Sequence, residues 1–447
     1  MPSDLQPLLI SLQNFWRKYR FIFVRIKLDK IMPNITIFEQ KRIVLAVTGS
    51  IAVYKAVDLA SKLTQAGALI DVIMTESAQR FISPLTFQSV TGRPVYTDLW
   101  QAESSGGLGT HIAHVGLGEG ADVIVVVPAT AHSMAKLATG LADNLLTVTA
   151  LAARCPVMIA PAMDGGMYHH PATQANLNTL IERGVILIPP EEGRFASGLI
   201  GLGRLPDTST LMGHIRRVLG RKGELKDCKV VVSAGGTREA IDPVRYVTNR
   251  SSGKQGHAIA QSALDAGASE VILVSAAQNI DVPIGATLVS VASAQEMLAG
   301  ILEHIENADA LVMSAAVADF RPATVADQKI KKSTDGSDGI TIPMTRTPDI
   351  LMNIKENRAK TGYPRVVVGF AAESQNLLEN AQSKLMRKGL DMIVANDITA
   401  TDAGFATENN RVVIIDAEGQ HPLELSTKAV VAETIIKRIS QFLEDLS

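Results

Sequence analysis

Short apolar runs of strand length alternate with helix-like stretches along most of this chain of 447 residues. In the first half these runs begin at Arg42, Leu69, Ala121, Pro156 and Val185. Strands that alternate with helices fold into a parallel, doubly wound sheet, because each helix carries the chain back to start the next strand. Such a sheet binds its ligands at the carboxyl ends of the strands. The alternation therefore predicts both the fold class and the edge at which a site lies.

The alternation begins again at Lys229, so we expect an α/β protein with two doubly wound, Rossmann-like domains and mainly parallel sheets. The expected divisions are an N-terminal extension at residues 1–40, a first domain at 41–204, a linker with a helix at 205–228, and a second domain at 229–447. The extension is basic and aromatic. We expect it either to be disordered or to precede a true start at Met32, with the core beginning at Arg42; the alternative is a surface helix or a partner-binding helix. The strands of the second domain are expected near Val230, Val271, Leu288, Leu311, Val366, Met392 and Val412.

Composition excludes several classes of protein. The net charge of −2 gives no indication of binding to nucleic acid or to an acidic membrane. No apolar run approaches the roughly 20 residues that a membrane span needs. The spacing of Cys155 and Cys228 suits neither a disulfide framework nor a metal cage, so we expect a reducing cytoplasm.

The stretch from Lys229 to Gly256 combines an apolar strand, the pair Gly235-Gly236 and a polar loop that leads into a helix. Glycines let the backbone approach a neighbour closely, and a helix N-terminus favours anions. The stretch contains neither the G-x-G-x-x-G pattern of dinucleotide-binding proteins nor a complete P-loop. It therefore predicts a phosphate-binding geometry of another kind.

Two features of the first half are open to more than one interpretation. The turn Thr48-Gly49-Ser50 suits a single phosphate, but it is equally typical of an ordinary strand-to-helix turn with an N-cap serine. The run GLGEG at residues 116–120 precedes a strand instead of following one, so it is not a dinucleotide fingerprint, and we expect a loop there. His114, just before it, is either a general base or a solvated histidine.

Longer motifs carry a family resemblance. TGSIAVYKA, HVGLGEGADVIVVVPAT, GLADNLL and PAMDGGM resemble the flavin-binding cysteine decarboxylases. The second half is similar to the phosphopantothenate–cysteine ligases in AGGTREAIDPVRYVTNRSSGKQG, AAVADFRPATVADQKIKK, TPDIL, VVVGFAAES and ANDI. Fused in this order over residues 41–445, the two halves resemble the bifunctional coenzyme A biosynthesis proteins of bacteria.

For the first domain, the resemblance implies a flavodoxin-like fold and FMN-dependent decarboxylation of 4′-phosphopantothenoylcysteine to 4′-phosphopantetheine. His114 matches the family's catalytic histidine, Ser197 takes the place of its catalytic cysteine, and Asp164 and Met167 fall at substrate positions. The FMN contacts implied by the resemblance are Gly49, Ser50, Thr75, Pro128, Ala129 and Thr130.

Two positions depart from the decarboxylase pattern. The family's PAMN reads PAMD here, and an ionised Asp164 accepts hydrogen bonds without donating them and repels a substrate carboxylate. The family's ACG reads Ala196-Ser197-Gly198, which replaces the cysteine that donates a proton with a much weaker acid. The ligase motifs have no such departure.

For the second domain, the resemblance implies that CTP activates 4′-phosphopantothenate as an acyl-cytidylate, which the cysteine amine then attacks. Positive charge and Mg²⁺ support such a leaving pyrophosphate, although no Mg²⁺ ligand is assigned. Asn249 matches the residue that holds the acyl-cytidylate, and Lys329 a lysine that contacts the nucleotide and takes part in catalysis. The other implied CTP contacts are Met313, Ser314, Ala315, Asp319, Pro348, Asp349, Ile350, Leu351, Phe370, Lys384 and Lys388.

The resemblance also implies homo-oligomers, with flavin sites shared between subunits and ligase domains paired as dimers. Two other hypotheses remain. An active ligase could be fused to a flavin domain that does not decarboxylate this substrate, which Asp164 and Ser197 motivate. Alternatively, both halves could be dinucleotide-dependent oxidoreductases, although neither first strand-to-helix turn has the required fingerprint.

Overall fold

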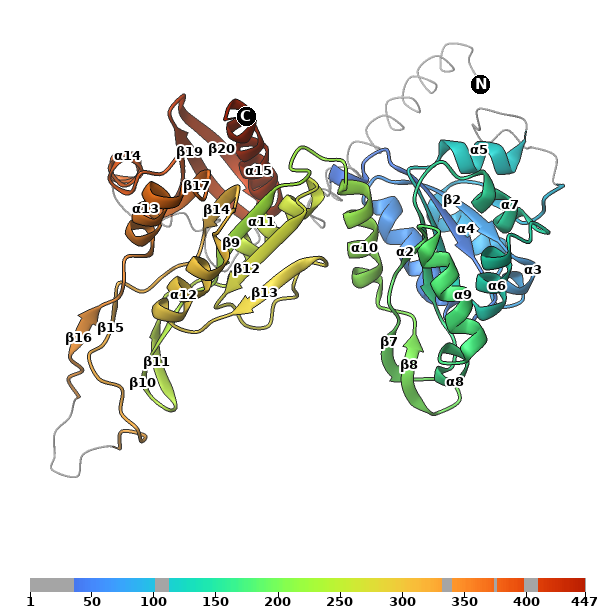
Figure 1. Cartoon of the computed structure of the whole chain (residues 1–447), viewed down its shortest axis with the longest axis horizontal. Helices are drawn as coiled ribbons and strands as arrows, with labels where there is room; N and C mark the ends of the chain where they lie inside the picture. Colours follow the sequence, from blue (N-terminus) through green and yellow to red (C-terminus); the bar gives the residue numbers. More distant parts are fainter. Residues whose placement is uncertain (1–35, 101–111, 332–339, 374–375, 398–408, 447) are drawn as a thin grey trace, which may run out of the picture.

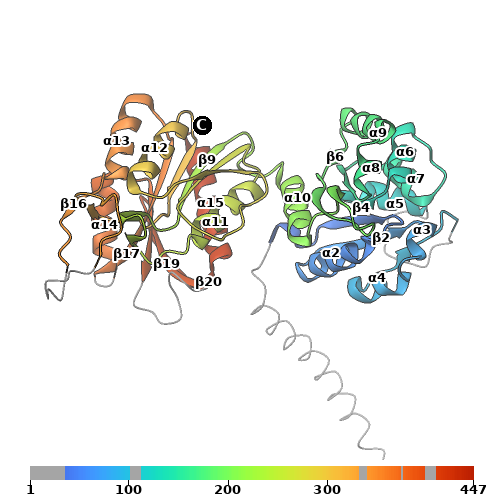
Figure 2. The ribbon, with the colours of Figure 1, turned by 90° about the horizontal axis from the view of Figure 1, so that it is seen from below.

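The computed structural model describes residues 36–100, 112–331, 340–373, 376–397 and 409–446. Two α/β halves lie side by side, and the chain passes once from one to the other (Figures 1 and 2). The predicted extension up to residue 35, and residues 332–339 of the polar loop that follows Lys331, lie outside the described residues. Within the described part, no helix has the length and apolar character needed to span a membrane.

The first sheet is parallel and has the strand order β3-β2-β1-β4-β5-β6, as in a doubly wound Rossmann-like fold. Buried apolar residues fill its central strands because both faces are covered by helices. The predicted fold class is confirmed. The strands are β1 (Arg42–Val47), β2 (Leu69–Met74), β3 (Val95–Tyr96), β4 (Val123–Ala129), β5 (Val157–Pro161) and β6 (Ile186–Leu187).

Two hydrophobic clusters cover the faces of this sheet. One contains side chains from η2 (Thr36–Phe38), α2 (Val53–Gln65), α4 (Pro84–Thr91) and α10 (Thr208–Gly220). The other contains side chains from α5 (Ala113–Gly120), α6 (Ala131–Thr139), α7 (Leu145–Ala152) and α9 (Pro171–Glu182). Short helices α3 (Glu76–Gln79) and α8 (Gly165–Tyr168) follow β2 and β5, and β7 (Glu191–Arg194) pairs with β8 (Ile200–Arg204) as a separate hairpin.

Two sequence-based expectations for this half are wrong. The core begins before Arg42, because Phe38 is fully buried within it. The GLGEG run is also no loop, since it forms most of helix α5. A Cβ on Gly118 would lie 3.0 Å from the Thr149 carbonyl oxygen, so this glycine allows α5 to pack closely against α7.

The second sheet has the order β13-β12-β9-β14-β17-β18-β19-β20. Its first part is parallel, and the last two strands form an antiparallel edge. All the expected strands are present, whereas β20 was not expected. The strands are β9 (Lys229–Ala234), β12 (Glu270–Ser275), β13 (Ala286–Ser290), β14 (Ala310–Met313), β17 (Val366–Glu373), β18 (Met392–Asp397), β19 (Asn409–Asp416) and β20 (Gly419–Thr427).

Helices α11 (Lys254–Asp265) and α15 (Lys428–Asp445) cover one face of this sheet. The other face carries α12 (Ala294–His304) and α13 (Ile350–Thr361), while α14 (Leu377–Lys388) packs beside β18. Two small antiparallel pairs lie away from the sheet in Figure 1, namely β10 (Arg238–Asp242) with β11 (Arg245–Thr248) and β15 (Phe320–Pro322) with β16 (Met344–Arg346).

Helix α10 joins the two halves (Figure 1). Leu211, Ile215 and Val218 on this helix belong to the core of the first sheet, although the sequence places the helix in a linker. On the other side, the Arg216 guanidinium pairs with the Asp265 carboxylate of α11, with Nε to Oδ1 at 3.1 Å. The proposed domain boundaries remain a prediction.

Candidate functional sites

The turns after β1 and β4 meet where the strand order of the first sheet reverses, which is the usual ligand-binding position in such sheets. The Thr48 hydroxyl donates to the Pro128 carbonyl oxygen at 2.6 Å and accepts from the Thr130 amide at 3.1 Å. Thr130 also caps helix α6. The predicted FMN residues at 128–130 are therefore held directly beside the Thr48–Ser50 turn.

The turn after β1 also packs against the helix that follows β2. A Cβ on Gly49 would lie 2.5 Å from the Cβ of Ser77, so only glycine fits. Thr75 is the N-cap of that helix, α3. Ser50 does not cap α2, whose N-cap position is Ala52, so the interpretation of Ser50 as an N-cap is wrong. Gly49, Ser50 and Thr75 thus gather at one edge of the sheet.

The two departures from the decarboxylase pattern contact each other. The Ser197 hydroxyl donates to Oδ2 of Asp164 at 2.9 Å, although 33 residues separate them in the chain. The other carboxylate oxygen, Oδ1, accepts from the Gly166 amide at 3.0 Å and caps helix α8. Met167, on the same helix, is 52% exposed. The aspartate is therefore held by its own helix and by the β7–β8 hairpin.

His114 lies away from this pair. It belongs to α5, which is at the top of the first half in Figure 1, whereas α8 and the β7–β8 hairpin are at the bottom. The described residues of one chain therefore do not bring His114 together with Asp164 and Ser197.

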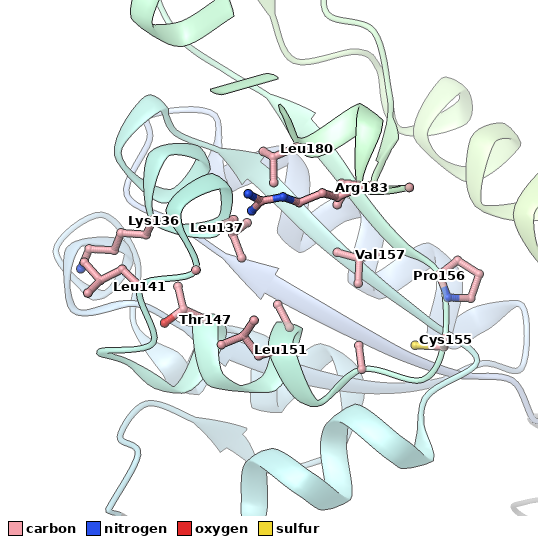
Figure 3. Close-up of a pocket in the computed structure, with 15 residues that line it drawn as sticks. Lys136, Leu137, Leu141, Thr147, Leu151, Cys155, Pro156, Val157, Leu180 and Arg183 are labelled. Carbon is pink, nitrogen blue, oxygen red and sulfur yellow. The ribbon is translucent and has the colours of Figure 1, made fainter. Parts of the chain in front are cut away.

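A cavity of about 350 Å³ between α6, α7, α9 and β5 is distinct from all of these positions (Figure 3). It is lined by Leu137, Leu151, Arg183 and Cys155, among others, and by none of the predicted site residues. Cys155 lies before the amino end of β5, whereas Asp164 follows its carboxyl end. Burial raises the pKa of the Cys155 thiol to about 11. This cysteine therefore cannot replace the missing family cysteine.

In the second half the corresponding reversal of strand order lies between β9 and β14. Gly235, with a φ of +83°, directly follows β9, and a Cβ there would lie 2.4 Å from the Ala277 amide nitrogen. A Cβ on Gly236 would lie 2.5 Å from the Asn249 carbonyl oxygen. The glycine pair allows close approach, as expected, and the neighbour that it admits is the chain itself.

Asn249 is fixed against the turn that follows β14. Its Nδ2 donates to the carbonyl oxygens of Ala316 at 3.3 Å and Val317 at 3.1 Å. The same turn is tied to β9, since the Ser314 hydroxyl donates to the Ser233 carbonyl oxygen at 2.6 Å. The asparagine predicted to hold the acyl-cytidylate is therefore held beside the predicted nucleotide residues.

A pocket of about 860 Å³ opens at this edge of the second sheet. Every residue predicted for the ligase site lines it except Lys329. Its cationic side chains are Arg250, Arg346, Lys384, Arg387 and Lys388, against the carboxylates of Asp319 and Asp349. An excess of fixed positive charge suits a polyphosphate.

Two of the predicted lysines are held by partners at the pocket. Lys388, whose side chain is 9% exposed, forms an ion pair with Asp349. Burial raises the pKa of the Asp349 carboxyl, but the hydrogen bonds from Lys388 and the Met352 amide outweigh it and hold the pKa below its ordinary value. Lys384 donates to the Phe370 carbonyl oxygen at 2.8 Å. Both ammonium groups are thus set in place by the fold.

The pocket contains residues that sequence reasoning missed. Arg250 and Arg346 line it. Arg250 lies within the family motif NRSSG and Arg346 directly precedes TPDIL, so both motifs could have identified them. Asn396, in the ANDI motif, is 7% exposed, and its Oδ1 has no hydrogen-bond partner within the described part of the chain. An unsatisfied buried amide oxygen that lines a pocket is a candidate ligand contact.

Lys329 lies outside this pocket. It is exposed and follows the β15 strand, in a segment anchored against the β10–β11 pair. Among the described residues, no group of three or more His, Cys, Asp or Glu side chains could hold a metal ion.

Comparison with known proteins divides the chain into the same two halves. Residues 35–220 match the family model for flavoproteins, and residues 225–443 match that for the DNA/pantothenate metabolism flavoprotein C-terminal domain. The coenzyme A biosynthesis bifunctional protein CoaBC of Bacillus subtilis is 44% identical over 404 residues, which cover 90% of this chain and 97% of that relative. The Vibrio cholerae protein of the same name is 42% identical over 404 residues, 90% of this chain and 98% of that relative.

The chain belongs to the CoaBC family. Among solved structures, the C-terminal domain of a CoaBC protein is similar over 50% of this chain and 100% of that chain, with 40% identity and a TM-score of 0.42. The resemblance found in the sequence is confirmed, and the chain is a flavoprotein-type domain fused to a ligase-type domain. CoaBC membership does not favour a pair of dinucleotide-dependent oxidoreductases. The roles of individual residues remain predictions.

Proposed function

We propose that the chain catalyses two successive steps of coenzyme A biosynthesis. The second domain joins cysteine to 4′-phosphopantothenate with CTP, and the first decarboxylates the resulting 4′-phosphopantothenoylcysteine to 4′-phosphopantetheine. The observation that carries this proposal is the 860 Å³ pocket, which gathers the predicted nucleotide residues from distant parts of the chain. Membership in the CoaBC family supports both steps.

In the ligase step the pocket's cations serve the triphosphate. Lys384, Lys388 and the neighbouring arginines stabilise the charge that develops on the leaving pyrophosphate. Mg²⁺ would enter with the nucleotide, since this ion is commonly bound by phosphates and one or two carboxylates, and Asp319 and Asp349 are the carboxylates at the pocket. Asn249 holds the activated acyl group until the cysteine amine attacks it.

In the decarboxylase step we propose FMN as the cofactor. The carboxyl edge of the first sheet fits it chemically: the Ser50, Thr75 and Thr130 hydroxyls and the start of α2 suit a phosphate, while Ile51 and Tyr54, 64% and 60% exposed, offer apolar surface for a ring system. Bound FMN would supply the two-electron oxidation of the thiol-bearing carbon, which makes the carboxylate on the adjacent carbon easy to lose, and would return the two electrons to give the product. His114 serves as the base, and Asp164 and Met167 contact the substrate.

The separation of His114 from Asp164 and Ser197 supports a homo-oligomer whose flavin sites are shared between subunits. In such an assembly, α5 of one subunit faces α8 and the β7–β8 hairpin of the next. We also retain the domain boundaries at residues 41–204 and 229–447, paired ligase domains and a cytoplasmic location as proposals. The absence of disulfides, with Cys155 and Cys228 free, supports a reducing compartment.

The proposal is tested by supplying the purified chain with CTP, Mg²⁺, 4′-phosphopantothenate and cysteine. We expect pyrophosphate release that depends on CTP and 4′-phosphopantothenate, and that continues at a partial level without cysteine. We also expect a yellow protein whose visible spectrum is that of bound FMN. NADH-dependent turnover without pyrophosphate release would contradict the proposal.

A further inference from the structure

The segment that carries Lys329 is held in place by a carboxylate outside the pocket. Asp242 ends strand β10, and its side chain is fully buried. Its Oδ2 accepts from the Ile330 amide at 3.1 Å and from Nε of Arg245 at 2.9 Å. Arg245 also donates to the Ile330 carbonyl oxygen at 2.6 Å. One residue next to Lys329 is therefore bound through both of its backbone polar groups.

The anchorage extends to the other side of Lys329. The Ala326 amide donates to the Ile241 carbonyl oxygen at 3.0 Å, so the segment from residue 326 to residue 330 is attached at both ends to the end of β10. The lysine side chain is exposed between these attachments. Its backbone is therefore held on both sides, while its side chain remains exposed to solvent.

Asp242 is itself rigidly held. Its other oxygen, Oδ1, accepts from the Val244 and Arg245 amides, each at 2.9 Å, and so closes the turn between β10 and β11. The hydrogen bonds from Arg245 and from the Val244 and Ile330 amides outweigh burial and hold the pKa of Asp242 at about 2. The carboxylate therefore remains ionised, and an acceptor to Ile330, throughout the physiological pH range.

We propose that Asp242 is a positioning residue for Lys329. Asp242 fixes the lysine-bearing segment through the Ile330 backbone, and it thereby sets the reach of the Lys329 ammonium group toward the nucleotide. This inference rests on the proposed ligase function and deepens it. A buried carboxylate that holds a neighbouring peptide group reduces the number of conformations available to a flexible lysine. Less conformational entropy is then lost when the lysine contacts its ligand, which is preorganisation.

Asp242→Asn separates this role from a general effect on folding. The amide oxygen can still accept from the turn amides, but its NH₂ group faces the Ile330 amide and the Arg245 guanidinium as a donor, so both contacts are lost. Asp242→Ser is a second variant, because serine also closes such turns but is too short to reach Ile330. Asp416→Asn is a matched control, since Asp416 is equally buried, accepts from the Glu418 amide, and binds Nε of Arg438 at 2.8 Å.

The first measurement is hydrogen exchange of the full-length protein, followed in peptides that span residues 326–331. We expect exchange of the Ile330 amide to rise about tenfold or more in Asp242→Asn and Asp242→Ser. It should remain unchanged in Asp416→Asn. Equal protection in wild type and Asp242→Asn would overturn the proposal while leaving the proposed ligase function intact.

The second measurement is the rate of pyrophosphate release from CTP and 4′-phosphopantothenate without cysteine. We expect kcat to fall about 10- to 100-fold in Asp242→Asn, with a smaller change in KM for CTP. Adding Asp242→Asn to Lys329→Ala should cause no further loss, because Asp242 acts through Lys329. Losses that multiply, or a Lys329→Ala protein with undiminished turnover, would overturn the proposal. Wild-type protein that releases no pyrophosphate would instead overturn the proposed function, and this inference with it.

Discussion

The two candidate sites occupy the same place in two similar sheets but differ in completeness. The pocket of the second domain is built within one chain, from Asn249 after β11 round to Lys388 on α14, and contains all the predicted ligase residues but Lys329. In the first domain, His114 is separated from Asp164 and Ser197. A shared architecture therefore does not imply that each site is complete in a single chain.

The halves also differ in how they depart from the family pattern. The ligase motifs are intact, whereas the decarboxylase motifs carry two changes that lie in hydrogen-bond contact. A serine that replaces a cysteine donates to an aspartate that replaces an asparagine. The contact favours a coupled change over two independent losses, because the Ser197 hydroxyl donates directly to the Asp164 carboxylate.

The largest expected effect concerns the ligase alone. Asn249→Ala removes an amide that is fixed by two backbone carbonyls beside the nucleotide residues. Removal of one such group at a reacting centre costs about 10²- to 10³-fold in rate, so we expect ligation to fall by that factor. Decarboxylation of supplied 4′-phosphopantothenoylcysteine by the same protein should remain unchanged, as measured by phosphopantetheine formation.

Asn357→Ala is the control for this variant, because Asn357 also donates to a backbone carbonyl, that of Tyr363, but lies outside the pocket. It should ligate at the wild-type rate. A loss of both activities in Asn249→Ala would mean that the two sites are not independent.

A smaller effect is expected at the Asp164–Ser197 pair. Ser197→Ala removes the donor that holds Oδ2 of Asp164, and the loss of one such hydrogen bond corresponds to about a tenfold fall in decarboxylation. If the residues act as a unit, Asp164→Ala and the double variant should have equal rates. If the two losses in decarboxylation rate multiply in the double variant, Ser197 acts independently of Asp164. The ligation rate of the same proteins is the internal control and should not change.

The smallest effect is expected at Cys155. Because burial raises the pKa of the Cys155 thiol to about 11, its thiolate fraction at pH 8 is far lower than that of an ordinary exposed thiol. Alkylation should therefore be slow at pH 8 and should accelerate as the pH rises toward 11. Cys155→Ala should decarboxylate at the wild-type rate; a large loss would place this cysteine in the reaction after all.

Most of the fold could be predicted from the apolar runs. β2, for example, begins at Leu69 as the sequence predicts, because it is a nearly continuous apolar run that is buried on both faces of the sheet. The expectation of a loop at 116–120 is wrong, because glycines are typical of loops but Gly118 here allows close packing between α5 and α7. The small β10–β11 and β15–β16 pairs have no comparable apolar signal, because most of their residues are exposed.

The site was less predictable than the fold. Motifs identified most of the pocket-lining residues, but no local pattern could indicate that Ser197 reaches Asp164 across 33 residues, since this depends on how the β7–β8 hairpin folds back. The same holds for Asp242, whose partner Ile330 lies 88 residues away. Such contacts depend on the tertiary path of the chain, and sequence spacing does not encode them.

The central claim is that one chain carries both activities despite the altered pair in its flavin domain. The most direct measurement supplies the purified, FMN-loaded protein with 4′-phosphopantothenoylcysteine and follows the product by mass spectrometry. We expect catalytic turnover to 4′-phosphopantetheine without an added oxidant or reductant. Protein that ligates with CTP but forms no 4′-phosphopantetheine would contradict it, and would identify the chain as a ligase fused to a flavin domain with a different task.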